Sequence, residues 1–388
     1  MNDRASPRRS HRVLRGIGRV LVGVVAGVAI FVAFSAVMRV QGVNLPAPTG
    51  PMPVGRTEMA LNDTGRVDPF FSDGRTRELA VWIWYPAEEG ASGAPAPYVP
   101  AAWAPLVNTE VPAALSQDLT TVRTNSIENA ALEGRPPAVV LMPGLGEPVA
   151  SYSALAEDLA SHGYAVIGIN PTGSTDVVFP DGHVVGATAA GNVSEMVIDR
   201  WYESAARVAN VWAADAEYVV RALAASPPHI GALDFQHVAY IGHSMGGAAA
   251  FEACRQDPTC GGAVDMDGTL WTDVRNTGLE APSLLLQDDQ SGECDAFCQR
   301  ATPDFDRVMA AQNAERFAIA GSRHMNYSDL ALLWGPANAF VLGTIDADPM
   351  TAITRELVLS FVDVHVRDMP AAGISEAAAR HPEVQAVH

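Results

Sequence analysis

The pentapeptide Gly242-His243-Ser244-Met245-Gly246 constrains this chain more than any other feature. A short apolar run at 237–241 precedes it, and a stretch of small residues at 247–251 follows it. This order predicts a strand, a sharp turn and a helix, with Ser244 at the apex of the turn. Such a turn strains the serine backbone, and a side chain at either flanking glycine would collide with a neighbouring element. The segment therefore predicts a serine poised to act as a nucleophile.

A serine hydroxyl is a weak nucleophile unless a base removes its proton and an acid holds the tautomer of that base. In the α/β-hydrolase fold these groups follow in the chain order serine, acid, histidine. His324 lies in the loop directly after a predicted strand at 316–321, which is where the histidine of this fold is found. It is the one histidine of ten that combines this position with the required order.

The acid has more than one candidate. Asp267 ends the predicted strand that follows the elbow helix, whereas Asp288 and Asp289 end the next apolar run at 282–287. Asp265 would face the same side as Asp267, because alternate residues of a strand share a face, but it lies inside the strand. Chain order and position alone leave both Asp267 and Asp288 open.

Several segments taken together resemble the platelet-activating-factor acetylhydrolase family, in its plasma and type II forms, and its bacterial relatives. The resemblance extends from about residue 50 to about residue 329. It is found in the elbow and in the segments 50–55, 81–86, 142–146, 151–164 and 321–329.

This resemblance implies an α/β-hydrolase fold, and the alternation of predicted strands and helices independently predicts a mostly parallel central sheet with helices on both faces. The family places its acid after the strand that follows the elbow helix, which favours Asp267 over Asp288. The resemblance also implies an oxyanion hole formed by the main-chain N–H groups of Leu145 and Met245. The sequence departs from the family pattern in the second acid, Asp265, and in the residues that follow Asp267.

The implied activity is that of a serine carboxylic-ester hydrolase that works through an acyl-enzyme, without a metal or organic cofactor. Its implied substrates are short-chain or oxidised acyl esters of lipids. The same triad would also serve an acyltransferase, a general esterase, a lipase or a polyester hydrolase. A non-catalytic binding protein on this fold is disfavoured, because such proteins usually lack a member of the triad.

The N-terminus has a separate organisation. Six arginines precede the uncharged apolar run 20–38, which is long enough to cross a bilayer as a helix. The arginine excess predicts a cytoplasmic N-terminus, with the catalytic part anchored in the membrane and lying outside the cytoplasm. The alternative is a cleaved secretory signal. The predicted organisation is a basic tail (1–19), an anchor (20–38), a linker (39–55), a catalytic domain (56–368) and a C-terminal tail (369–388).

The net charge limits the kinds of partner that the chain can bind, and the cysteine content indicates the cellular compartment. The 388-residue chain carries a net charge of −19, and removal of the first 38 residues, with six arginines and one aspartate, leaves −24. This charge argues against a nucleic-acid-binding function. The expected partner, a small-molecule or lipid ester, is the one that the family resemblance implies. Four cysteines in an exported chain allow three disulfide pairings, of which the one with two local bridges, Cys254–Cys260 and Cys294–Cys298, is favoured.

Two helical segments complete the prediction. Apolar residues, including Trp201 and Trp212, recur at helical spacing over 193–225 and predict a core helix. The weakly helical stretch 101–119 is expected to form part of a cap near the active site.

Overall fold

The computed structural model describes residues 7–103, 116–193, 198–289, 291, 296–310, 314–369 and 373–387. Its centre is a mixed, mostly parallel sheet with the strand order β1-β5-β2-β3-β7-β6-β10-β11-β12-β13-β14, and β4 pairs with β5. A separate pair, β8 and β9, is antiparallel. The strands are β1 (Val43–Asn44), β2 (Val54–Val67), β3 (Thr76–Pro86), β4 (Pro95–Pro97), β5 (Val122–Glu128), β6 (Pro137–Met142), β7 (Ala165–Asn170), β8 (Val177–Val178), β9 (Val184–Val185), β10 (Asp234–His243), β11 (Cys260–Met266), β12 (Ser283–Gln287), β13 (Ala314–Ile319) and β14 (Val384–Ala386).

Six neighbouring strands, β7, β6, β10, β11, β12 and β13, run parallel to one another. Their carboxyl ends therefore meet at one edge of the sheet, which is where ligands of such sheets bind. The loops after β6, β10, β11, β12 and β13 contain the predicted site residues, so the topology brings these loops together. The predicted α/β-hydrolase fold is confirmed.

Helices cover both faces of the sheet. The helices are α1 (Pro7–Val40), α2 (Ser153–Ser161), α3 (Ile198–Ala225), α4 (Met245–Gln256), α5 (Val274–Thr277), α6 (Ala296–Met309), α7 (Ala347–Val366) and α8 (Ile374–Ala379). Side chains of α2, α7 and α8 pack in one hydrophobic core, and those of α3, α4 and α6 pack in the other. Within β10, Ile241 belongs to the first core and Tyr240 to the second. This strand is thus buried on both faces, as its continuous apolar run requires.

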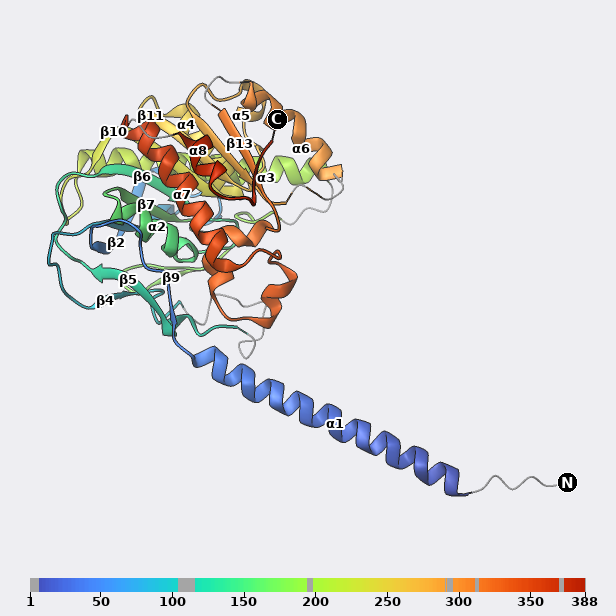
Figure 1. The fold of residues 1–388 in the computed structure, drawn as a ribbon. Helices are drawn as coiled ribbons and strands as arrows, with labels where there is room; N and C mark the ends of the chain where they lie inside the picture. Colours follow the sequence, from blue (N-terminus) through green and yellow to red (C-terminus); the bar gives the residue numbers. More distant parts are fainter. Residues whose placement is uncertain are drawn as a thin grey trace.

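The N-terminal helix α1 extends away from the catalytic domain, as Figure 1 shows. Its segment Leu21–Val40 has a mean hydropathy of 2.6, is 6 % buried, and is long and apolar enough to cross a membrane. Beyond it, the predicted linker is part of the domain rather than a free tether. β1 pairs with β5, and Gln117 Nε2 donates a hydrogen bond of 3.0 Å to the carbonyl of Arg39.

The described part of the predicted C-terminal tail, 369–388, packs against the catalytic domain. α8 buries Ile374 and Ala377, and β14 adds to the sheet as an antiparallel neighbour of β13. A three-residue strand is too short to show a periodic pattern, which is why the sequence does not reveal it. The predicted cap helix at 101–119 falls largely on residues 104–115, which lie outside the described residues.

One predicted disulfide is confirmed. Cys254 and Cys260 form a disulfide with their Cα atoms 5.1 Å apart, joining the end of α4 to the start of β11. The second predicted bridge involves Cys294, which lies outside the described residues.

Replacing both Cys254 and Cys260 with alanine is expected to lower the free energy of unfolding by about 2 kcal/mol, because a bridge that closes a short loop removes a modest amount of chain entropy. Urea unfolding followed by tryptophan fluorescence measures this loss. An unchanged urea midpoint would contradict the stabilising role of the bridge.

Candidate active site

Ser244 sits between β10 and α4 in a strained backbone conformation. Its φ is 55° and its ψ is −118°, in a region that residues other than glycine rarely occupy. A Cβ atom on Gly242 would lie 2.0 Å from the carbonyl oxygen of Gly246, and one on Gly246 would lie 2.2 Å from that of Met142. Both positions therefore require glycine, as the elbow motif predicts.

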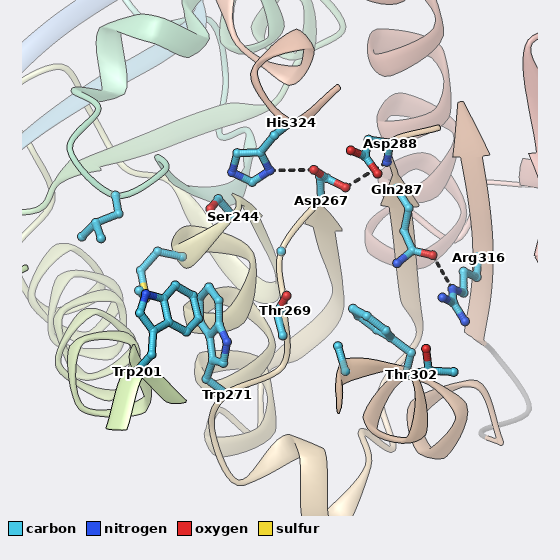
Figure 2. A pocket seen from close by; sticks show the side chains of 15 residues that line it. Trp201, Ser244, Asp267, Thr269, Trp271, Gln287, Asp288, Thr302, Arg316 and His324 are labelled. Atoms are coloured by element: carbon cyan, nitrogen blue, oxygen red, sulfur yellow. Dashed lines mark hydrogen bonds and ion pairs between the residues drawn. The ribbon is translucent and has the colours of Figure 1, made fainter. Parts of the chain in front are cut away.

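The structure brings His324 and Asp267 together at the same edge of the sheet. His324 Nδ1 lies 2.6 Å from Asp267 Oδ2, within hydrogen-bond distance. Asp267 Oδ1 accepts a 2.8 Å hydrogen bond from the main-chain N–H of Asp288. Figure 2 shows the imidazole of His324 between Ser244 and Asp267. A histidine that lies between a serine and a carboxylate is the arrangement that a catalytic triad requires.

The other candidate acids hold the loops of the site. Asp288 supports Asp267 through its main-chain N–H, and Asp289 Oδ2 accepts a 2.7 Å hydrogen bond from the N–H of Gly321 in the loop before His324. Asp265 Oδ1 accepts a 2.7 Å hydrogen bond from the N–H of Gly268. Asp265 therefore braces the turn that contains Asp267, where the φ of Asp267 is 56°.

Burial raises the pKa of the Asp265 carboxyl well above its ordinary value, and the nearby charge of Asp267 adds to the effect. A carboxyl group in this environment favours its neutral form. Asp265 therefore acts on the site through its hydrogen bond to Gly268, whereas Asp267 is the acid that contacts His324.

Two opposing effects act on the pKa of His324. Burial lowers it, but the hydrogen bond and charge of Asp267, with the charge of Asp288, outweigh burial and raise the pKa above its ordinary value. The side chain is 46 % exposed, so solvent weakens these charge effects. The direction is that of a base whose protonated form is stabilised by its acid partner.

The loop around His324 is held by Asn326. Its Oδ1 accepts hydrogen bonds from the N–H groups of Arg323, at 2.9 Å, and Gly343, at 2.7 Å. The residues His324–Tyr327 form a short 3₁₀ turn. The side chain of Asn326 thereby joins the residue before His324 to the segment that contains Gly343.

A cavity of about 410 Å³ opens beside Ser244. Leu145, Met245, Asp267 and His324 line it, so the two predicted oxyanion donors border the same space as the nucleophile. Met245 is the first residue of α4, and the N–H groups of a first helical turn have no partner within the helix. The described residues contain no group of three or more His, Cys, Asp or Glu side chains suited to hold a metal ion.

One part of the cavity wall is aromatic and another part is polar. Trp201 and Trp271 pack edge to face, with ring centroids 5.1 Å apart, whereas Arg316 Nε donates a 2.6 Å hydrogen bond to Gln287 Oε1 (Figure 2). Trp201 packs against the hydrophobic core that contains the other apolar residues of α3, as predicted, and it also lines the cavity. Helical spacing identifies the buried face of a helix but cannot tell which part of that face borders a cavity.

The sequence matches the model of the family described as platelet-activating factor acetylhydrolase, isoform II, over residues 37–172 and 222–369. The chain belongs to this family. The match includes the elbow, both predicted oxyanion donors and the His324 loop. It leaves out residues 173–221, and therefore Trp201.

Two relatives add detail. The chain is 24 % identical over 241 residues to a probable 1-alkyl-2-acetylglycerophosphocholine esterase from Arthroderma benhamiae, and the match covers 60 % of this chain. It spans 59 % of the length of that relative. Among solved structures, a ferulic acid esterase from Streptomyces cinnamoneus is 29 % identical, with a TM-score of 0.76 over 89 % of this chain and 100 % of that one.

Proposed function

We propose that this chain is a serine carboxylic-ester hydrolase in which Ser244 attacks the carbonyl carbon of the ester. The observation on which this rests is the 2.6 Å contact between His324 and Asp267, next to a serine held in a strained elbow. A surface histidine would need neither a partner carboxylate at this distance nor the strained turn beside it. Membership of the acetylhydrolase family supports the same reaction.

The proposed steps follow from the positions of the groups. His324 Nδ1 donates to Asp267, so Nε2 is free to accept the proton of Ser244 as its oxygen bonds to the carbonyl carbon. The N–H groups of Leu145 and Met245 stabilise the oxyanion. His324 then donates the proton to the departing alcohol, which leaves an acyl group on Ser244. Water, deprotonated by the same histidine, releases the acid and restores the serine.

The proposed substrates are short-chain or oxidised acyl esters of lipids. The names of the family and of the fungal relative support an acetyl ester of a glycerophospholipid. A cavity of about 410 Å³ is near the small end of the range for ligand pockets, which favours a short acyl group.

Aromatic acyl esters are a second candidate. The edge-to-face pair Trp201 and Trp271 offers an aromatic wall, and aromatic rings prefer such packing. Trp201 lies outside the segments matched by the family, so this wall is not implied by family membership. The ferulic acid esterase neighbour supports the same candidate.

Hydrolysis of p-nitrophenyl esters of increasing acyl length, beside methyl ferulate, by the full-length chain in detergent tests the proposal. Highest kcat/KM on acetate or butyrate would support the short-acyl substrate, and highest kcat/KM on ferulate would support the aromatic one. A peak on long acyl chains would contradict both. Absence of turnover on every ester, with a folded chain, would contradict the hydrolase itself. Adding an alcohol acceptor distinguishes hydrolysis from acyl transfer.

The raised pKa of His324 predicts a pH profile for kcat/KM. Only neutral imidazole can accept the proton of Ser244, so kcat/KM should fall as pH drops through the pKa of His324. Because this pKa is raised, the fall should be centred above the ordinary histidine value of about 6.5. In Asp267→Asn the remaining activity should decline at a lower pH, because the partner that raises the pKa is gone. An acid limb unmoved by that substitution would contradict the assignment.

We also propose that α1 anchors the catalytic domain to a membrane, on the side outside the cytoplasm. The apolar segment of α1 and the arginines before it support this orientation. Protease added to intact cells should digest the catalytic domain, whereas protection of the domain until lysis would contradict the orientation. An N-terminus cleaved beyond α1 would instead indicate a secretory signal.

A further inference from the structure

Behind the candidate triad, three hydrogen bonds connect the oxyanion loop to the main chain of His324. The N–H of Gly144 donates to the hydroxyl oxygen of Tyr152 over 2.9 Å. That hydroxyl lies 2.7 Å from His243 Nδ1, and His243 Nε2 lies 2.9 Å from the carbonyl oxygen of His324. Both connecting side chains are 1 % exposed, so water does not compete for these bonds.

The chemistry of the groups fixes the direction of each bond. A carbonyl oxygen can only accept, so the proton on the His243 ring is at Nε2. Nδ1 of the neutral ring is then an acceptor, and the Tyr152 hydroxyl donates to it while accepting from Gly144. Burial, followed by the neighbouring charge of His324, lowers the pKa of His243 well below its ordinary value, which keeps the ring neutral. The three bonds are satisfied by this single arrangement of protons.

We propose that Tyr152 and His243 are positioning residues, which fix the position of the oxyanion loop relative to the catalytic histidine. The inference rests on the proposed function, since it assigns these residues a role in the same site. Gly144 directly precedes Leu145, whose N–H is the proposed oxyanion donor. At the other end, the bonded carbonyl belongs to His324 itself. Each end of the chain of bonds is therefore adjacent to a group that acts on the ester.

The close packing of these groups makes them mutually dependent. A Cβ atom on Gly144 would lie 3.0 Å from His243 Nδ1 and 3.3 Å from the Tyr152 hydroxyl. Removing that hydroxyl leaves two buried polar groups, the Gly144 N–H and His243 Nδ1, without their partner. A shift of about 1 Å in a catalytic group can cost about 10²-fold in rate, so a modest rearrangement here should be measurable.

Tyr152→Phe in the full-length chain tests the proposal. We expect kcat for the preferred p-nitrophenyl ester to fall about 10- to 100-fold while KM changes less than about 3-fold, because the loss concerns groups that act in the transition state. Tyr164→Phe is the matched control. It also removes a fully buried tyrosine hydroxyl, which donates a 2.6 Å hydrogen bond to Asp363 away from the site, and kcat should stay unchanged.

A pair of substitutions at His243 provides a second, independent measurement. The amide of His243→Gln can still donate to the carbonyl of His324, whereas His243→Ala can form neither bond. We expect His243→Gln to recover part of the kcat lost in His243→Ala. Labelling to completion with a fluorophosphonate counts folded sites, so that kcat is expressed per reactive serine in every variant.

The outcomes separate this inference from the proposed function. An active wild type, with Tyr152→Phe within about twofold of its kcat, would overturn the positioning role and leave the hydrolase intact. An equal loss in Tyr164→Phe would overturn it too, because the effect would then be one of stability. An inactive wild type would instead contradict the proposed function. If Tyr152→Phe does not fold, recovery by His243→Gln supports the proposal, and equal activity of the two His243 variants overturns it.

Discussion

Ser244→Ala is expected to lower kcat for ester hydrolysis by about 10⁵- to 10⁶-fold while the fold is retained. The reason is that no acyl-enzyme can form without the hydroxyl, and loss of a triad nucleophile in serine hydrolases has effects of this size. The substitution removes one oxygen atom from the strained turn and introduces no new bulk. Steady-state kinetics at saturating p-nitrophenyl ester, together with circular dichroism, measures both quantities.

The remaining oxyanion donors should give Ser244→Ala a small activity above the uncatalysed rate. Loss of less than about 100-fold, with the variant chemically homogeneous, would contradict Ser244 as the nucleophile. Ser322→Ala is a useful control, because Ser322 is a buried serine close to His324 in the chain whose hydroxyl donates to the carbonyl of Ile319. It should retain most of the wild-type activity.

Asp267→Asn and Asp288→Asn are expected to differ sharply. Asp267→Asn should lower kcat by about 10³- to 10⁴-fold, because an amide in place of the carboxylate no longer stabilises the imidazolium and can impose the wrong tautomer on His324. Asp288→Asn keeps the main-chain N–H that holds Asp267, so its kcat should fall less than about 10-fold. Each substitution replaces one carboxylate oxygen with an amide nitrogen, so each variant is a control for the other.

Parallel kinetics of the two variants on one ester decide the assignment. The large loss in Asp288→Asn, with a mild one in Asp267→Asn, would show that the acid had been assigned to the wrong strand end. Equal, large losses of kcat in the two variants would indicate that the charges of Asp267 and Asp288 both act on His324. Both charges raise the pKa of His324.

The sequence predicts those parts of the site that depend on local structure. The strained turn at Ser244 could be predicted because the elbow needs a fixed pattern of glycines within five residues, and the steric reason is seen at Gly242 and Gly246. His324 could be proposed from chain order and a strand end, and the structure places it in contact with Asp267. The confirmed fold follows from alternating strands and helices, together with the family resemblance that the family match bears out.

The acid that contacts His324 could not be chosen from the local sequence alone. β11 and β12 are parallel neighbours, so Asp267 and Asp288 arrive at the same edge of the sheet. They are close enough for a hydrogen bond between them, and position along the chain cannot separate two such residues. Only the side-chain directions set by the turn after β11 distinguish the acid that contacts His324.

Other parts of the site depend on contacts between distant segments. Tyr152 and His243 are 91 positions apart, and neither belongs to a pattern that would pair them. The sequence shows His243 only as part of the elbow, next to Ser244, and gives no sign of its two buried hydrogen bonds. Trp201 likewise reaches the cavity through the placement of α3 against the loop that contains Trp271.

The central claim is that hydrolysis proceeds through an acyl group on Ser244, and trapping that intermediate tests it most directly. The full-length chain is mixed with p-nitrophenyl acetate and quenched in acid within milliseconds, and its peptides are analysed by mass spectrometry. The account predicts a burst of p-nitrophenol and one acetyl group on the peptide that contains Ser244, both absent in Ser244→Ala. Steady turnover with an acetyl group on another residue, or a burst that persists in Ser244→Ala, would contradict it.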